Sequence, residues 1–515
     1  MADKKSSAAA DIAAGYVTIG KALELGTVVV DGQVDSSARV RIPLAMLNRH
    51  GLVAGATGTG KTKTLQNIAE QLSGAGVPVV MADIKGDLSG LCRPGEASDR
   101  TKARAGETGD DWTPTPFPVE FFSLGEGGVA LPVRATVTQF GPILLSKVLG
   151  LNDTQESTLG LIFHWADQQQ LPLLDTKDLR AVIQHLTSDE GKAEMKGIGG
   201  VSSATAGVIL RALVNLEAQG GDKFFGEPEL VPADLMRTHE GKGVITLLEL
   251  SEQQTNPKLF STFLMWLLAE LFEVLPEAGD LEQPKVVFIF DEAHLLFADA
   301  SKAFLERIEQ TVKLIRSKGV GVFFCTQLPT DIPNNVLSQL GARIQHALRA
   351  FTPEDQQALA KTVKTYPTTK NYDLSELLTS LGIGEAVVTV LSERGAPTPV
   401  AWARLRAPRS LMGAIGNQAI TDFCAVSPLH GKYAQTIDRE SAYEKLTAKI
   451  AGTAQTGGSP AAHEAPRARA PKGEKEEPGM MAEVLGSPAV KSFLRSMATQ
   501  AGREITRSLF GTRRR

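Results

Sequence analysis

The sequence predicts an α/β protein with a mainly parallel sheet that helices cover on both faces. The first observation is a strand, a loop and a helix in succession up to Gly74, followed by an apolar strand at 77–83. The second is that strands and helices alternate again from residue 243 onward. The third is that the strands at 286–290 and 320–326 are apolar almost throughout, which is typical of strands buried on both faces.

Residues 1–45 are expected to form a small β-type N-terminal segment. Its apolar runs at Thr27–Val30 and Arg39–Ile42 are rich in β-branched residues, and an Asp31-Gly32 turn signal separates them. These features predict short strands at the entry to the core.

The expected core occupies residues 46–90 and 241–450. Between them, residues 91–240 change first to a loop rich in Pro, Gly and charge, then to helical periodicity, so we predict a mainly helical insertion. The most apolar stretch, 257–275, is predicted to be a buried helix, because acidic residues interrupt it and would be costly in lipid. We therefore expect no stable membrane insertion.

The C-terminal region divides into two segments. Residues 451–480 contain almost no large apolar side chain, which predicts a disordered linker. Residues 481–515 are basic, and their apolar side chains share one helical face, which predicts a basic amphipathic helix. We favour a docked or solvated helix there over weak binding to an anionic membrane surface.

Composition leaves several classes of partner open. The formal net charge of -4 describes no strongly basic surface, so any contact with DNA requires a local patch. The three cysteines form no CxxC pair, which argues against a disulfide framework and a structural zinc site. The N-terminus has no apolar segment of the kind that a secretory signal needs. A cytoplasmic location fits these features.

Residues 55–62 match a complete phosphate-binding (Walker A) loop. Glycines let backbone N–H groups turn inward around phosphates, the lysine adds a positive charge, and the next hydroxyl reaches Mg2+. The alternative, a flexible Gly/Thr turn, does not require the flanking strand and helix that are both present here. The residues expected to bind ATP are Gly55, Ala56, Thr57, Gly58, Thr59, Gly60, Lys61, Thr62 and Thr64.

Two acids after the apolar strand Val287–Phe290 match a Walker B motif. We expect Asp291, together with Thr62, to hold Mg2+ and Glu292 to act as the general base toward water. An apolar strand ending in acids also occurs as a simple solubilised strand end, but the Walker A loop favours the catalytic interpretation. Asp83 at another strand tip either orients the same water or forms a local ion pair.

Other polar residues near these motifs have competing interpretations. Gln327 follows the strand at 320–326 and is expected to sense the γ-phosphate, although it could be only a polar strand terminus. His294 is expected to pack or hydrogen-bond rather than couple to catalysis. No guanine-reading Asn-Lys-x-Asp segment is present, so GTP is disfavoured.

The ordered set of motifs resembles the HerA-like ATPases of the HerA/FtsK group. The segments that carry the resemblance are Asn48–Thr62, Phe288–His294, Arg316–Gln327 and Arg343–Arg349. Within the group, the chain most resembles the YjgR family of HerA-like helicase-domain proteins, as the segment Asp83–Gly90 indicates. It implies a RecA-like core with a helical insertion, a homo-oligomeric ring that is expected to be a hexamer, and ATP hydrolysis at subunit boundaries. The segment before Gly55 is too short for the whole β-barrel domain of HerA.

The position of Arg316 in that resemblance implies an arginine finger, which is an arginine that acts in trans on the γ-phosphate bound to the adjacent subunit. A planar, permanently charged guanidinium suits the charge that accumulates there. The alternative role is a cation that stabilises a helix C-terminus. Arg343 and Arg349 are the competing fingers.

Two hypotheses of different classes follow. The first is a ring-forming ATPase that moves along or remodels DNA as a translocase or helicase. The second is an ATP-dependent switch or scaffold that binds a protein partner through residues 140–240 and never translocates.

Overall fold

The computed structural model describes residues 2–83, 86–197, 199–249, 257–279, 281–297 and 302–456. Residues up to Thr453 form one compact unit. The predicted linker beyond Thr456 and the predicted basic helix at 481–515 lie outside the described residues. Among the helices that the structure describes, none is both long and apolar enough to cross a membrane.

The unit is built on a twelve-stranded sheet in the order β2-β1-β14-β13-β12-β3-β11-β10-β4-β9-β5-β6. The strands from β12 to β6 run parallel, and β13, β14, β1 and β2 continue one side of the sheet in antiparallel fashion. The strand bounds are Ala22–Val30 (β1), Gln33–Pro43 (β2), Gly51–Ala54 (β3), Val79–Asp83 (β4), Val119–Leu124 (β5), Leu131–Val133 (β6), Ile245–Glu249 (β9), Val286–Phe290 (β10), Val320–Thr326 (β11), Ala342–Gln345 (β12), Glu385–Thr389 (β13) and Ala401–Leu405 (β14).

Helices lie on both faces of the parallel strands. The chain passes from β3 through α2 (Lys61–Gly74) to β4 in one direction along the sheet, and from β9 through α9 (Pro257–Val274) to β10 in the other. Right-handed crossovers therefore put α2 on one face and α9 on the opposite face, together with α11 (Lys302–Ile315) between β10 and β11. This arrangement confirms the predicted α/β class.

The N-terminal strands belong to the main sheet. Helix α1 (Ala2–Ala14), which the sequence analysis did not predict, packs against β1 and β2. β1 pairs with β14, so Thr27 lies opposite Arg404, far away in the sequence. The expected β-type segment thus extends the sheet of the core.

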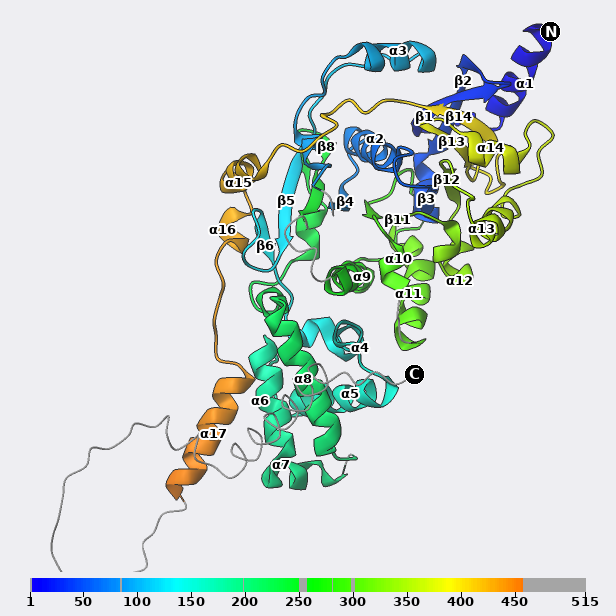
Figure 1. Ribbon diagram of the computed structural model, residues 1–515. Helices are drawn as coiled ribbons and strands as arrows, with labels where there is room; N and C mark the ends of the chain where they lie inside the picture. Colours follow the sequence, from blue (N-terminus) through cyan, green and yellow to red (C-terminus); the bar gives the residue numbers. More distant parts are fainter. Residues whose placement is uncertain are drawn as a thin grey trace, which may run out of the picture. The chain divides into compact units, whose positions relative to one another are not determined.

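Residues 91–240 contribute both helices and strands. Helices α4 (Val137–Leu149), α5 (Asp153–Gln168), α6 (Thr176–Thr187), α7 (Asp189–Glu194) and α8 (Ser203–Ala218) form the helical part, which lies beyond α9 from the sheet (Figure 1). Phe140 on α4 contacts Phe224, Phe225 and Trp266, and Trp266 belongs to α9. Strands β5 and β6, which we had grouped with the helical segment, instead complete the parallel side of the sheet.

Shorter elements complete the unit. They are α3 (Asp99–Thr108), the hairpin β7 (Thr238–His239) and β8 (Lys242–Gly243), α10 (His294–Phe297), α12 (Asn334–Leu337), α13 (Pro353–Val363), α14 (Leu374–Ser380), α15 (Asn417–Ala425), α16 (His430–Tyr433) and α17 (Ala442–Thr456). Helix α17 runs past residue 451, so the first residues of the predicted linker are helical. α15 and α16 pack beside β5 and β6.

Candidate active site

The phosphate-binding loop leaves the carboxyl end of β3 and enters α2 at Lys61. Its first residues are held between the ends of two neighbouring strands. The Gly55 amide donates to the Thr326 carbonyl at 3.2 Å, and the Ala56 amide donates to the Ala347 carbonyl at 2.8 Å. The loop thus starts from a position that three strands determine together.

The glycines are required by the local geometry. Gly58 and Gly60 have φ angles of 82° and 109°, in the left-handed region that side chains disfavour. A Cβ at Gly55 would lie 2.5 Å from the Cβ of His346, so no side chain fits there. These backbone angles curve the loop around the start of α2.

The loop offers the groups that a triphosphate needs. In the described part of the chain, the amides of Thr57, Gly58, Thr59 and Gly60 have no protein acceptor. The Lys61 ammonium donates to the carbonyls of Gly55 and Ala56, at 2.7 and 3.2 Å. Inward amides and a lysine folded over the loop fit a bound nucleotide phosphate.

The Walker B acids follow β10, which lies between β11 and β4 at the same edge of the sheet. Glu292 has a φ angle of 47°, unusual for a non-glycine residue, and its amide donates to Asp291 Oδ1 at 2.9 Å. Burial raises the pKa of the Cys325 thiol well above its usual value, and Asp291 and Lys61 also act on this thiol. The Walker A lysine and the first Walker B acid thus both act on Cys325 of β11, the strand that lies between β3 and β10.

Further predicted residues lie at this edge. Gln327 directly follows β11 and is exposed, one strand away from the phosphate loop. Asp83 ends β4 and accepts the amides of Asp87 and Leu88, at 3.1 and 2.7 Å. Burial raises the pKa of Asp83 to about 6. Its carboxylate thus holds the local turn.

Two residues of the site were not singled out from the sequence. His346, after β12, is fully buried beneath the loop and contacts Thr64 on α2. Glu249 ends β9 beside Asp83, and burial raises its pKa to about 8. Glu249 is the last residue of β9, and His346 directly follows β12. Neither residue belongs to the Walker motifs, so only the pairing of the strands reveals where the two residues lie.

The three candidate fingers have different surroundings. Arg343 donates to the carbonyls of Thr365 and Leu337, at 3.1 and 3.4 Å. Arg349 donates to the carbonyl of Thr57 in its own phosphate loop at 3.3 Å. Arg316 is exposed before β11, and its guanidinium has no hydrogen-bond or ion-pair partner in the described residues.

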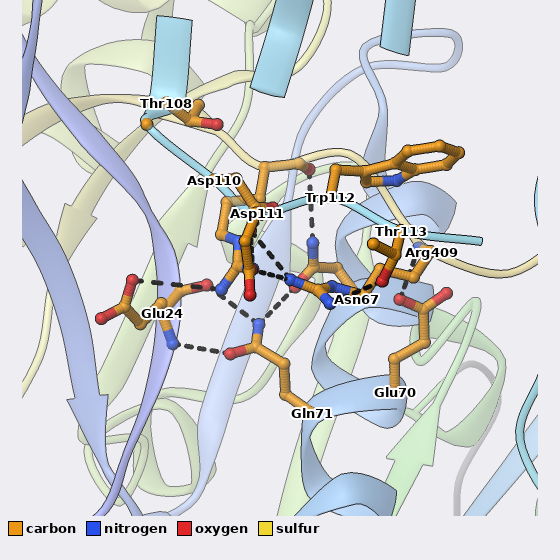
Figure 2. Close-up of polar contacts among 12 residues, drawn as sticks. Glu24, Asn67, Glu70, Gln71, Thr108, Asp110, Asp111, Trp112, Thr113 and Arg409 are labelled. Atoms are coloured by element: carbon orange, nitrogen blue, oxygen red, sulfur yellow. Dashed lines mark hydrogen bonds and ion pairs between the residues drawn. The ribbon is translucent and has the colours of Figure 1, made fainter. Parts of the chain in front are cut away.

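Helix α2 is anchored on the side away from the phosphate loop. The segment 406–411, which we call the strap, follows β14 and crosses α2. Glu70 accepts the backbone amide of Arg409 at 2.8 Å (Figure 2). Glu70 also accepts the backbone amide of Ser410 at 2.9 Å. Gln71 exchanges hydrogen bonds with the backbone of Glu24 on β1, at 2.7 and 2.9 Å. A fixed α2 holds the loop at its N-terminus in place.

Comparisons with known proteins identify the family of the chain. The model of the family described as "Helicase HerA-like C-terminal" matches residues 29–515. The DNA double-strand break repair helicase HerA of Saccharolobus solfataricus is 21% identical over 370 residues, which are 70% of this chain and 66% of that protein. The chain therefore spans just under two thirds of that relative's length.

Solved structures show the same fold. The bacterial conjugative coupling protein TrwB, in an unbound form, matches with a TM-score of 0.50 at 15% identity and covers 79% of this chain and 94% of its own. TrwB in complex with ADP and Mg2+ matches with a TM-score of 0.51 at 14% identity, over 76% of this chain and 97% of its own. The sheet and its helices are thus a RecA-like core. The chain belongs to the HerA-like helicase C-terminal family and is a P-loop ATPase.

Proposed function

We propose that the chain assembles into a homo-oligomeric ring that hydrolyses ATP between subunits and uses the cycle to move along DNA. Within one subunit, Lys61 and the loop amides bind the phosphates, Glu292 takes the proton of the attacking water, and Gln327 senses the γ-phosphate. Thr62 and Asp291 would hold Mg2+, which neutralises phosphate charge when bound. The position of Arg316 is the main observation in support of assembly into a ring.

Arg316 and the phosphate loop belong to opposite edges of the sheet. Arg316 precedes the start of β11, whereas the loop follows the carboxyl end of β3, which runs parallel to it. The strand Val320–Thr326 separates these edges by about 20 Å at about 3.3 Å per residue, beyond the reach of an arginine side chain. This separation supports a role for Arg316 toward the γ-phosphate of another subunit.

The surroundings of Arg316 support an anionic neighbour. A cavity of about 400 Å³ is lined by four cations and no carboxylate among the described residues: Arg49, Lys313, Arg316 and Arg343. His50 at its base is buried, and its ring bonds to the carbonyl of Val312 and the amide of Val322, at 2.8 and 3.1 Å. Uncompensated cations of this kind favour the approach of a phosphate group.

A mixing experiment tests the ring. Arg316→Ala and Lys61→Ala proteins are each expected to be nearly inactive, because one lacks the finger and the other lacks phosphate binding. Mixed rings should regain part of the ATPase activity, since some boundaries then pair an intact loop with an intact arginine. Full activity of Arg316→Ala alone would rule out the finger.

The proposal that the ring moves along DNA is supported by membership of the HerA-like helicase C-terminal family and by the similarity to a protein named as a DNA repair helicase. The narrower similarity to the YjgR family stays a prediction. ATPase rates with and without duplex DNA should be compared from about 50 to 200 mM salt. Stimulation that declines as salt rises indicates contacts with DNA phosphates. A rate that is indifferent to DNA at every salt concentration would instead favour an ATP-dependent switch acting on a protein.

A further inference from the structure

We propose that His346 is a positioning residue for ATP. It packs against the phosphate loop on the side of β12 and keeps the loop in the conformation that binds the triphosphate. The inference concerns the nucleotide site of a single subunit. It therefore holds or fails independently of the ring and of DNA.

His346 lies against three parts of the loop region, through its backbone amide, its Cβ and its ring. The His346 amide donates to the carbonyl of Ala54 at 2.7 Å, which fixes the residue beside the last residue of β3. Its Cβ lies 2.5 Å from the position that a Cβ on Gly55 would take, and its Cε1 lies 3.7 Å from the corresponding position on Gly60. The residue thus approaches Gly55 through its Cβ and Gly60 through its ring.

A hydrogen-bond path connects this ring to the loop. His346 Nε2 lies 2.9 Å from Thr64 Oγ1, and Thr64 Oγ1 lies 3.3 Å from the carbonyl oxygen of Gly60. With the proton on Nε2, the ring donates to Thr64, and Thr64 donates to Gly60. The end of β12 is in this way linked to Gly60, the glycine that directly precedes α2.

Thr64 is one of the residues predicted to bind the nucleotide. It is buried, and its hydroxyl contacts His346 and Gly60. The ring itself is fully buried, and its Nδ1 has no hydrogen-bond partner in the described part of the chain. Burial and the nearby Lys61 ammonium lower the pKa of His346 to about 4, so the ring adds support without adding charge.

The physical consequence is preorganisation. When a loop spends only a fraction of its time in the binding shape, the apparent dissociation constant rises by the inverse of that fraction. Once ATP is bound, its phosphates order the loop, so the rate at saturation depends little on the support. A positioning role therefore affects nucleotide affinity and KM far more than kcat.

The experiment compares full-length His346→Ala, His346→Gln and Thr64→Val proteins with wild type. ADP affinity is measured by calorimetry, and KM and kcat are measured with ATP and Mg2+. Loss of one buried hydrogen bond predicts that His346→Ala raises Kd and KM about five- to tenfold, with kcat within about twofold. His346→Gln should recover most of the affinity, because its amide can reach Thr64. The exposed His164 on α5 provides the control His164→Ala, which should match wild type.

The double variant His346→Ala/Thr64→Val should bind ADP no more weakly than the weaker single variant, because both changes break the same link. An unchanged Kd in every folded variant would overturn the proposal. So would a tenfold fall in kcat at unchanged Kd, or a loss in His346→Gln as large as in His346→Ala. Should His346→Ala fail to fold, an unchanged affinity of Thr64→Val would be decisive against the role.

Discussion

Glu292 Oε2 and His294 Nδ1 lie 3.4 Å apart just beyond the end of β10. The second Walker B acid thus meets the ring of the residue two positions later, at the start of α10. The backbone of Glu292 is left-handed, with a φ angle of 47°. Because non-glycine residues in this conformation are strained and concentrate at functional sites, we expect the geometry around Glu292 to serve catalysis.

Replacing Glu292 with Gln should leave nucleotide binding intact and reduce hydrolysis about a hundredfold or more, because the amide keeps the shape but cannot accept a proton. Calorimetry with ADP and a steady-state ATPase assay measure the two effects. Glu376→Gln, an exposed change on α14, is the control. Near-normal turnover of Glu292→Gln would move the base to Asp83 or Asp87.

His294→Ala should reduce kcat about three- to tenfold without changing ADP affinity, because the ring orients Glu292 rather than touching phosphate. His294→Asn should retain part of the activity, since its amide keeps a hydrogen-bonding group near the carboxylate. A kcat equal to wild type in His294→Ala would show that the ring only packs there, as the sequence analysis favoured.

Glu249 predicts a dependence of stability on pH. In the described residues neither carboxylate oxygen has a hydrogen-bond partner, and burial, followed by Asp83 and Asp87, raises the pKa to about 8. The folded protein therefore keeps a proton that the unfolded chain loses near pH 4.3. This group contributes most to stability below that pH, and the contribution falls as the pH rises toward about 8.

Glu249→Gln should accordingly raise the free energy of unfolding by about 1–3 kcal/mol at pH 8 and change it little at pH 5. Urea unfolding at both pH values measures the difference. Glu96→Gln, at an exposed position, should behave like wild type at both. An equal effect of Glu249→Gln at the two pH values would contradict the raised pKa.

Glu70→Ala should lower the free energy of unfolding by about 2–4 kcal/mol, because it leaves the part-buried amide of Arg409 and the buried amide of Ser410 without an acceptor. It should also raise the KM for ATP, since α2 carries the phosphate loop. Glu70→Gln keeps one acceptor oxygen and should therefore lower the free energy of unfolding by less than Glu70→Ala does. A loss below about 1 kcal/mol in Glu70→Ala would show that the strap does not anchor α2.

Local patterns were sufficient for much of the fold. Continuous apolar runs predicted β4, β10 and β11, because strands buried on both faces need no polar alternation. The spacing of apolar residues predicts α2, and the apolar stretch interrupted by acidic residues predicts α9. The Walker motifs were recognisable because glycines, a lysine and paired acids must occur in a set order for phosphate chemistry.

Other features depended on contacts between distant segments. The strand β6 is too short to show an alternating or continuous apolar pattern that would predict a strand. It forms by pairing with the side of β5 that β9 leaves unpaired. Similarly, β1 joins the sheet through β14, which no local pattern could indicate. Strands near the two ends of the unit, β1 and β14, therefore pair within one sheet without any local signal for it.

The sequence by itself determined the phosphate-binding chemistry of this protein, because Gly55–Thr62 and the Asp291–Glu292 pair carry it within short segments. Only the tertiary structure decided that Arg316 lies at the opposite edge of the sheet from its own loop, and that His346 lies beneath it. Both facts follow from parallel strand pairing, which brings the ends of strands far apart in the sequence to one edge and separates the two ends of each strand by its length.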